Sequence, residues 1–251
     1  VLYLNHLPQA PEGDTRDQLV DEAVELCRRA KAIAETAATV RQANAIEAML
    51  ALVAQRPEKT VDLLEGAMEP MMGESTLLAQ AYLTQGRAED AIRCAQVSIY
   101  QALIGLLNDL PLLAGIYTGD PARLAEIYRR TSVLIDTFDL EKVYVNCAAV
   151  YGAFAAAFAQ AGDEEHVYGC LERYVHLCGE LKFPVKLGTD SFFDKVGPWL
   201  DDLDLGDDAP RDSELIRQSM IAGLVGNPAF AGIADEPRFK QLVADLKARL
   251  S

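Results

Sequence analysis

Apolar residues recur at three- and four-residue steps along almost the whole chain, which is the pattern of helices with one buried face. In residues 14–36 the apolar positions on one face are Leu19, Ala23, Cys27, Ala30 and Ile33. Comparable segments are 39–54, 75–85, 88–107, 121–137, 140–161, 164–181, 212–225 and 237–250, and Pro57 is placed to open one more helix. No run alternates between polar and apolar positions with hairpin turns at its ends. The pattern predicts an all-α protein.

Three segments share one spacing: a large residue, a helix-ending residue four positions later, and a small residue after five more. The three sets are Tyr82, Gly86 and Ala91; Phe158, Gly162 and Val167; and, as a weaker copy, Leu52, Arg56 and Val61. In a helical hairpin the large residue fills the gap between two antiparallel helices, and glycine ends the first helix in a left-handed conformation. A generic hairpin gives the same local pattern. Three copies favour a single α-solenoid of stacked helix pairs over residues 1–251.

The segments AYLTQGRAEDAI and AFAQAGDEEHV place acidic residues at the start of the second helix, where the helix dipole favours them. These segments resemble tetratricopeptide repeats. The Ala- and Gly-rich segment 147–162 fits the centre of such a stack, since its small residues let helices approach while Phe154 and Phe158 fill the remaining space. We therefore expect a tetratricopeptide-like α-solenoid.

Membrane insertion is not expected. Segment 147–162 is shorter than the about 20 residues of a membrane span, and residues 1–7 lack the basic region of a secretory signal. The five cysteines are odd in number and widely spaced, which favours reduced thiols over a disulfide framework. These features predict a cytoplasmic protein.

The helical period breaks down over residues 183–211, which hold three prolines, three glycines and seven aspartates. We expect an irregular acidic loop here, pinned to the stack by a short helix; a binding role is the alternative. The pinning residues are Phe192, Phe193, Val196, Trp199 and Leu200. Residues 212–251 are then expected to cap the solenoid, because a terminal repeat must cover an open apolar face.

Residues for catalysis or metal binding are scarce. The three histidines are His6, His166 and His176, and the last two are ten positions apart, not at the helical ligand spacing of three or four. The aspartate clusters at 201–204 and 207–208 lack the glycine and terminal glutamate of a calcium loop. No nucleophile motif and no glycine-rich phosphate loop occurs. We expect no enzyme activity, no cofactor and no metal.

Charge restricts the partners. Lys and Arg total 23 against 38 Asp and Glu, a net charge of −15. Phosphate contacts need clustered cations, so this balance excludes a nucleic-acid-binding surface as the main role of these residues.

Amides inside otherwise apolar helices give the candidate binding site. An amide both donates and accepts, which suits the backbone of an extended peptide in a concave groove, and nearby tyrosines such as Tyr144 supply amphipathic walls. The alternative is that the amides are exposed or join neighbouring helices. The candidate ligand-binding residues are Gln80, Gln96, Tyr100, Gln101, Asn146 and Tyr151.

Several stretches together resemble the C-terminal part of bacterial XRE-type (Cro-like) helix-turn-helix transcriptional regulators. They are AQVSIYQALIGLLNDLPLLAGIY (95–117), LKFPVKLGTDSFFD (181–194), WLDDLDLGDDAPRDSELI (199–216) and NPAFAGIADEPRF (227–239). The opening VLYLNHL also resembles the helix end that precedes the repeats in these regulators. The resemblance implies that a DNA-binding domain precedes this sequence in the parent protein, and that DNA is bound only through that part.

The resemblance also implies a regulatory domain that senses a peptide or protein ligand, and a homodimer. The apolar stripe of the last helix (Phe239, Leu242, Val243, Leu246 and Leu250) either caps the solenoid or contributes to the dimer. A constitutive tetratricopeptide-type scaffold is the alternative function. A hydrolase or transferase is disfavoured because no catalytic cluster is present.

Overall fold

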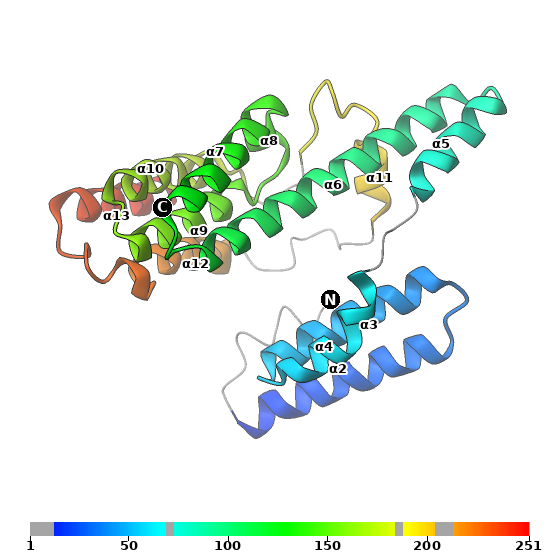
Figure 1. Ribbon diagram of the computed structural model, residues 1–251, viewed down its shortest axis with the longest axis horizontal. Helices are drawn as coiled ribbons and strands as arrows, with labels where there is room; N and C mark the ends of the chain where they lie inside the picture. The colour runs from blue at the N-terminus through cyan, green and yellow to red at the C-terminus, as the bar shows by residue number, and fades with distance from the viewer. Residues whose placement is uncertain (1–12, 69–72, 184–187, 204–212, 251) are drawn as a thin grey trace. The chain divides into compact units, whose positions relative to one another are not determined.

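The computed structural model describes residues 13–68, 73–183, 188–203 and 213–250, and every regular element in these ranges is helical (Figure 1). The predicted all-α class is confirmed. The chain divides into two compact units, Val1–Met72 and Gly73–Ser251, where the sequence analysis assigned one domain. Each unit has its own cluster of buried apolar side chains.

The first unit contains α2 (Asp14–Ala32), α3 (Ala37–Val53), α4 (Pro57–Leu64) and the short 3-10 helix η2 (Glu65–Met68). Helix α3 packs against both α2 and α4. The Thr36 hydroxyl accepts a hydrogen bond from the Thr39 N–H at 3.2 Å and so caps α3, and Pro57 opens α4 as predicted. The core cluster of this unit consists of Val20, Ala23, Val24, Cys27 and Leu50, and Ala43, Ala48 and Ala51 of α3 are also buried.

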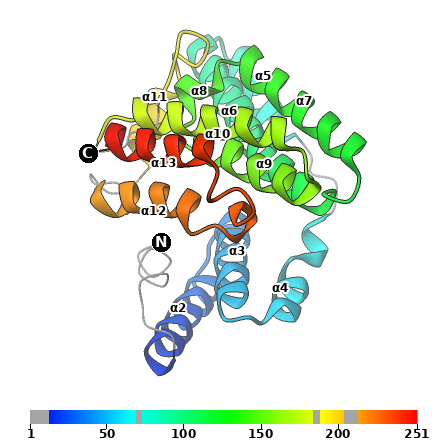
Figure 2. The ribbon, with the colours of Figure 1, turned by 90° about the vertical axis from the view of Figure 1, so that its left-hand side faces the viewer.

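The second unit begins with a helical hairpin, α5 (Glu74–Thr84) and α6 (Ala88–Ile116). Three more helices follow: α7 (Pro121–Thr137), α8 (Leu140–Val143) and α9 (Cys147–Ala161). The remaining elements are α10 (Glu164–Glu180), α11 (Gly197–Asp202), α12 (Ser213–Val225), η3 (Pro228–Phe230) and α13 (Pro237–Leu250). Helix α9 packs against α6, α7, α10 and η3, and α10 packs against α13 on its other side (Figure 2).

Three helix-to-helix turns share one backbone geometry. A residue with positive φ ends the first helix in each: Gln55 (56°), Gly86 (73°) and Gly162 (75°). The N–H of the next residue then donates to the carbonyl five positions earlier, as in a Schellman turn. These bonds are Arg56 to Ala51 at 2.8 Å, Arg87 to Tyr82 at 2.9 Å and Asp163 to Phe158 at 3.0 Å. The roles of Gly86 and Gly162 are confirmed, but the weaker copy turns at Gln55, one residue before the predicted Arg56.

Helix α9 lies at the centre of the second unit's core, as the small residues of 147–162 predicted. Eight of its residues are buried, including Phe154 and Phe158 at 0 and 1 % exposure. Both rings meet the Tyr128 ring edge-on, with centroids 5.2 and 5.3 Å apart. Aromatic rings in this arrangement fill the space that the alanines leave.

Two predicted helix boundaries were wrong. Helix α6 was expected to end near residue 107, but it continues through Pro111 to Ile116. A proline inside a helix costs about 3 kcal/mol, and burial of Leu107 and Ala114 on either side of it holds the helix together. The predicted helix 140–161 is instead α8 and α9, separated at residues 144–146. The buried residues keep their three- and four-residue spacing across this break, so periodicity alone does not reveal it.

The segment 188–203 is attached to the second unit largely as predicted. Phe193 and Val196 are fully buried, and Trp199 and Leu200 of α11 are half-buried. Phe192 differs, because its side chain is 53 % exposed. The predicted acidic stretch 204–211 lies outside the described residues.

In α13 the stripe residues Phe239, Leu242, Leu246 and Leu250 are buried, and the helix packs against α10 and α12. These four residues therefore pack inside the unit, as the capping alternative expects, and Val243 is partly buried against the same core. Red α13 and yellow-green α10 lie side by side in both views (Figures 1 and 2).

Among the described helices, α6 is the one that is long and apolar enough to cross a membrane, judged by length and composition alone. Only 22 % of its most apolar window is buried. In the sequence Asp109 and Pro111 interrupt this stretch, so segment 147–162 is the one that its lack of charge points to.

Candidate ligand-binding site

The six candidate residues do not form one site. Gln80 on α5, Gln101 on α6 and Asn146 before α9 are exposed. The other three contact residues of other elements, in two separate groups. The alternative weighed for the amides, that they are exposed or join neighbouring elements, describes their positions better than a common groove.

Gln96 and Tyr100, one helical turn apart on α6, hold the segment 188–203. The Gln96 side chain donates to Asp194 Oδ1 at 2.8 Å, and its carbonyl oxygen accepts from the Lys195 backbone N–H at 2.8 Å. The Tyr100 ring meets those of Phe193 and Trp199 edge-on, with centroids 5.5 and 6.4 Å apart. The Gln96 oxygen binds a backbone N–H, as expected for an amide in a groove, but that backbone belongs to the same chain and the amide nitrogen bonds to a side chain.

Tyr151 belongs to a polar cluster formed by α8, α9 and α10. Its hydroxyl donates to Glu141 Oε1 at 3.0 Å, and Arg173 Nη2 lies 3.0 Å from the same oxygen. The Arg173 guanidinium also stands 5.7 Å from the centre of the Tyr151 ring. We call these three residues the Glu141 cluster. Sequence reasoning missed Glu141 and Arg173, since no local motif links residues 32 positions apart.

The protonation of the Glu141 cluster is fixed by its surroundings. Burial, followed by the neighbouring Glu141 carboxylate, raises the pKa of the Tyr151 phenol, so it remains a hydrogen-bond donor at neutral pH. The Arg173 side chain is 46 % exposed and that of Glu141 is 24 % exposed. The guanidinium therefore presents donors to solvent, which suit a carboxylate or carbonyl oxygen of a ligand.

The cysteines of the second unit's core are poor nucleophiles. Burial raises the pKa of Cys147 and Cys170 to about 12 and that of Cys178 to about 11. The thiolate is the reactive form, and these thiols hold their protons at neutral pH. They act as packing residues.

His166 is tied to a structural contact. Its Nδ1 lies 2.8 Å from Asp163 Oδ2, and its ring stacks on Phe158 with centroids 4.6 Å apart. Asp163 also caps α10 by accepting from the His166 N–H at 3.2 Å. Within the described ranges, no three His, Cys, Asp or Glu side chains gather as they do around a metal ion.

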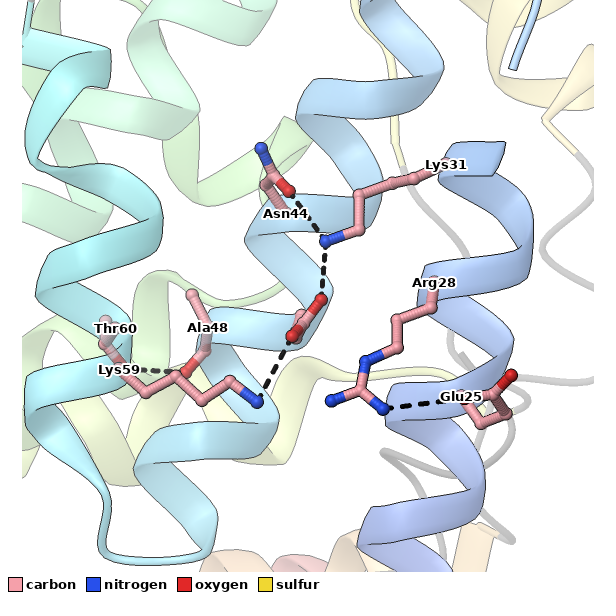
Figure 3. A network of polar contacts seen from close by, with 8 residues as sticks. Glu25, Arg28, Lys31, Asn44, Ala48, Lys59 and Thr60 are labelled. Carbon is pink, nitrogen blue, oxygen red and sulfur yellow. Dashed lines mark hydrogen bonds and ion pairs between the residues drawn. The ribbon is translucent and has the colours of Figure 1, made fainter. Parts of the chain in front are cut away.

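The first unit contains a buried charged network that sequence reasoning also missed (Figure 3). The Glu47 side chain is 5 % exposed and lies 2.6 Å from Lys31 Nζ and 3.3 Å from Lys59 Nζ. Lys31 also donates to Asn44 Oδ1 at 3.1 Å. Although burial alone raises the pKa of Glu47, hydrogen bonds from the two lysines outweigh it and leave that pKa lowered. The carboxylate is satisfied within the fold, as a structural ion pair requires.

No protein-family model, no curated protein and no solved structure matches this chain.

Proposed function

We propose that the chain is a non-catalytic regulatory domain with a tetratricopeptide-like arrangement of helix pairs. It senses a peptide or protein ligand and controls a helix-turn-helix DNA-binding domain in the same cytoplasmic protein, as a homodimer. DNA is contacted only by that other domain.

The observation that carries the proposal is the turn shared by three helical hairpins. The turns at Gln55, Gly86 and Gly162 have the same positive φ and the same bond to the carbonyl five residues before. Repeated helix pairs of this kind typically build extended surfaces for protein ligands.

Two features support a peptide or protein as the ligand. Gln96 on α6 already holds an irregular segment, because its oxygen accepts from the Lys195 backbone N–H and its nitrogen donates to the Asp194 carboxylate. The Glu141 cluster offers a half-exposed arginine beside a buried tyrosine, a combination that suits the end of a peptide. The high thiol pKa values of the buried cysteines agree with a non-catalytic role.

The coding frame upstream of Val1 tests the regulator proposal. We expect it to encode a small domain with a basic recognition helix. A frame without such a domain would overturn the regulator proposal and favour a constitutive scaffold.

A titration of this chain with duplex DNA tests the division of labour. At physiological salt we expect weak or no binding, because a net charge of −15 repels the phosphate backbone. Tight binding that weakens steeply with added salt would contradict the proposal.

A further inference from the structure

Helix α6 has two apolar faces, and the second is open to solvent. Its core face includes Tyr100, Leu103 and Leu107, all buried. On the second face, four large side chains stand seven residues apart. They are Ile92 (43 % exposed), Ile99 (40 %), Leu106 (46 %) and Leu113 (40 %).

A second row completes a heptad pattern on this face. Three positions after each of the four large residues come Ala95, Ala102, Asp109 and Ile116, and all are exposed. The two rows occupy the a and d positions of a coiled coil, a pattern that fits a partner helix. We call these eight residues the α6 seam. It spans 25 residues, or about 36 Å of helix, and extended exposed apolar surface marks interaction sites.

We propose that a second copy of this chain covers the α6 seam, with the two α6 helices antiparallel about a two-fold axis. In this register Leu106 and Leu113 each meet an alanine of the partner. Ala95 lies opposite the partner's Leu113, and Ala102 lies opposite the partner's Leu106. The outermost layers pair Ile92 with the partner's Ile116, and the layers between those of Ala95 and Ala102 pair Ile99 with the partner's Asp109. Alternating large and small side chains let two helices interdigitate closely.

Charge favours the antiparallel over the parallel arrangement. A parallel pair places Asp109 directly against the partner's Asp109 inside the seam, and pairs alanine with alanine in two layers. The antiparallel pair separates the two carboxylates by ten residues, about 15 Å along the helix. Coulomb repulsion at about 15 Å is much weaker than between two carboxylates in direct contact.

The area suits a dimer. Two helices in contact over this length bury roughly 1,200 Å² in total, the lower end of the range for specific interfaces. Each copy carries a net charge of −15, so we expect the dimer to tighten as salt screens the repulsion between copies. A lipid bilayer fits less well, because Gln101 and Asn108 are exposed on another side of the same helix.

Two opposite charges at one position test the arrangement. In Ile99→Asp a carboxylate faces the partner's Asp109, so we expect dimer affinity to fall by at least about 100-fold. In Ile99→Lys the ammonium faces that carboxylate and forms two symmetric ion pairs. Affinity is then expected to stay within about 10-fold of wild type. The measurement is sedimentation equilibrium of the full chain, with circular dichroism to verify that each variant is folded.

Further variants sharpen the result. Asp109→Leu removes the charge from the seam and is expected to tighten the dimer by about 10-fold. The control is Val225→Asp on α12, which is 58 % exposed and lies outside the seam, and it should leave the affinity unchanged.

Three outcomes would overturn the proposal. The first is a wild-type chain that stays monomeric at high micromolar concentration, which would mean that no second copy covers the seam. The second is equal loss of dimer in Ile99→Asp and Ile99→Lys, which excludes the antiparallel register. The third is seam-dependent sedimentation with phosphatidylcholine vesicles, which assigns the seam to lipid. The inference rests on the homodimer of the proposed function, so the first outcome would also remove that homodimer, whereas none of the three outcomes bears on ligand sensing.

Discussion

The two compact units bury the inner faces of their helices with different side chains. In the second unit the rings of Phe154, Phe158 and Tyr128 interlock around α9. Over residues 13–68 the first unit has a smaller core without aromatic rings, and it buries Glu47 between Lys31 of α2 and Lys59 of α4. We interpret this difference as two ways to fix helix register, by the shapes of rings in one unit and by one paired carboxylate in the other.

The aromatic core gives the largest expected effect. Phe158→Ala removes a ring that is 1 % exposed, and we expect it to lower the free energy of unfolding by about 3–5 kcal/mol. Urea titration followed by circular dichroism measures the change, and hydrogen exchange should locate it in α9 and α10. Phe192→Ala is the control, because that ring is 53 % exposed. A loss below about 1 kcal/mol for Phe158→Ala would show that the core closes around the cavity.

The charged network should give the next largest effect. Glu47→Ala leaves two lysines without their shared partner, and we expect a loss of about 2–3 kcal/mol. This expected loss is smaller than for a fully buried ion pair, because the Lys31 and Lys59 side chains are 24 and 34 % exposed and can turn to water. Hydrogen exchange should rise in α2, α3 and α4.

Two controls separate pairing from packing in this network. In the ion pair between Glu25 and Arg28, each side chain is about 60 % exposed (Figure 3). Glu25→Ala should therefore change the free energy of unfolding by under about 0.5 kcal/mol. The triple variant Lys31→Met, Glu47→Leu and Lys59→Met removes all three charges. It should fall within about 1 kcal/mol of wild type, and a triple variant as unstable as Glu47→Ala would contradict the pairing argument.

The same network makes stability depend on pH. The folded-state pKa of Glu47 is lowered, so its contribution is present above the unfolded value of about 4.3 and is lost as pH falls through the folded value. The difference in unfolding free energy between wild type and Glu47→Gln should therefore shrink on acidification below that unfolded value. A difference that stays constant between neutral pH and pH about 3 would mean that the carboxylate gains nothing from ionisation.

The shared turns give smaller effects. Gly86→Val and Gly162→Val each force a β-branched residue to a φ above 70°, and we expect each to cost about 1–3 kcal/mol. No neighbouring atom lies within 4 Å of an added Cβ at either site, so the cost comes from the backbone alone. Asparagine tolerates this conformation better, and the Gly→Asn variants should lose less. Unchanged melting temperatures for both valine variants would contradict the assignment.

The smallest expected change has the opposite sign. Gln55 occupies the equivalent position in the first unit with φ 56°, where a side chain costs about 1 kcal/mol. Gln55→Gly is expected to stabilise the chain by a few tenths to about 1 kcal/mol, after the added entropy of glycine in the unfolded state. Thermal denaturation should show a higher midpoint. A lower midpoint would show that the Gln55 side chain contributes more than its backbone conformation costs.

Sequence predicted the features that are encoded locally. The turns at Gly86 and Gly162 follow from glycine at a helix end, and the burial of α9 follows from its small and aromatic residues. The left-handed Gln55 was placed one residue late, since no glycine marks it. The break between α8 and α9 was missed because the buried positions keep their helical spacing across it.

The candidate site was predicted poorly because its contacts are distant in the sequence. Gln96 bonds to residues 98 and 99 positions away, and Tyr151 meets Arg173 from another helix. Amide residues in apolar helices were correctly noticed. Their partners depend on how helices pack, which periodicity does not report.

The chain contains one tryptophan, Trp199, and its position has a spectroscopic consequence. The indole lies in α11, edge-on to the Tyr100 ring at 6.4 Å, in the segment that Gln96 also holds. Excited tyrosine transfers energy to tryptophan at such short range, and indole emission moves to longer wavelength when water reaches the ring. The native tryptophan fluorescence therefore reports, without an added label, whether segment 188–203 is attached to α6.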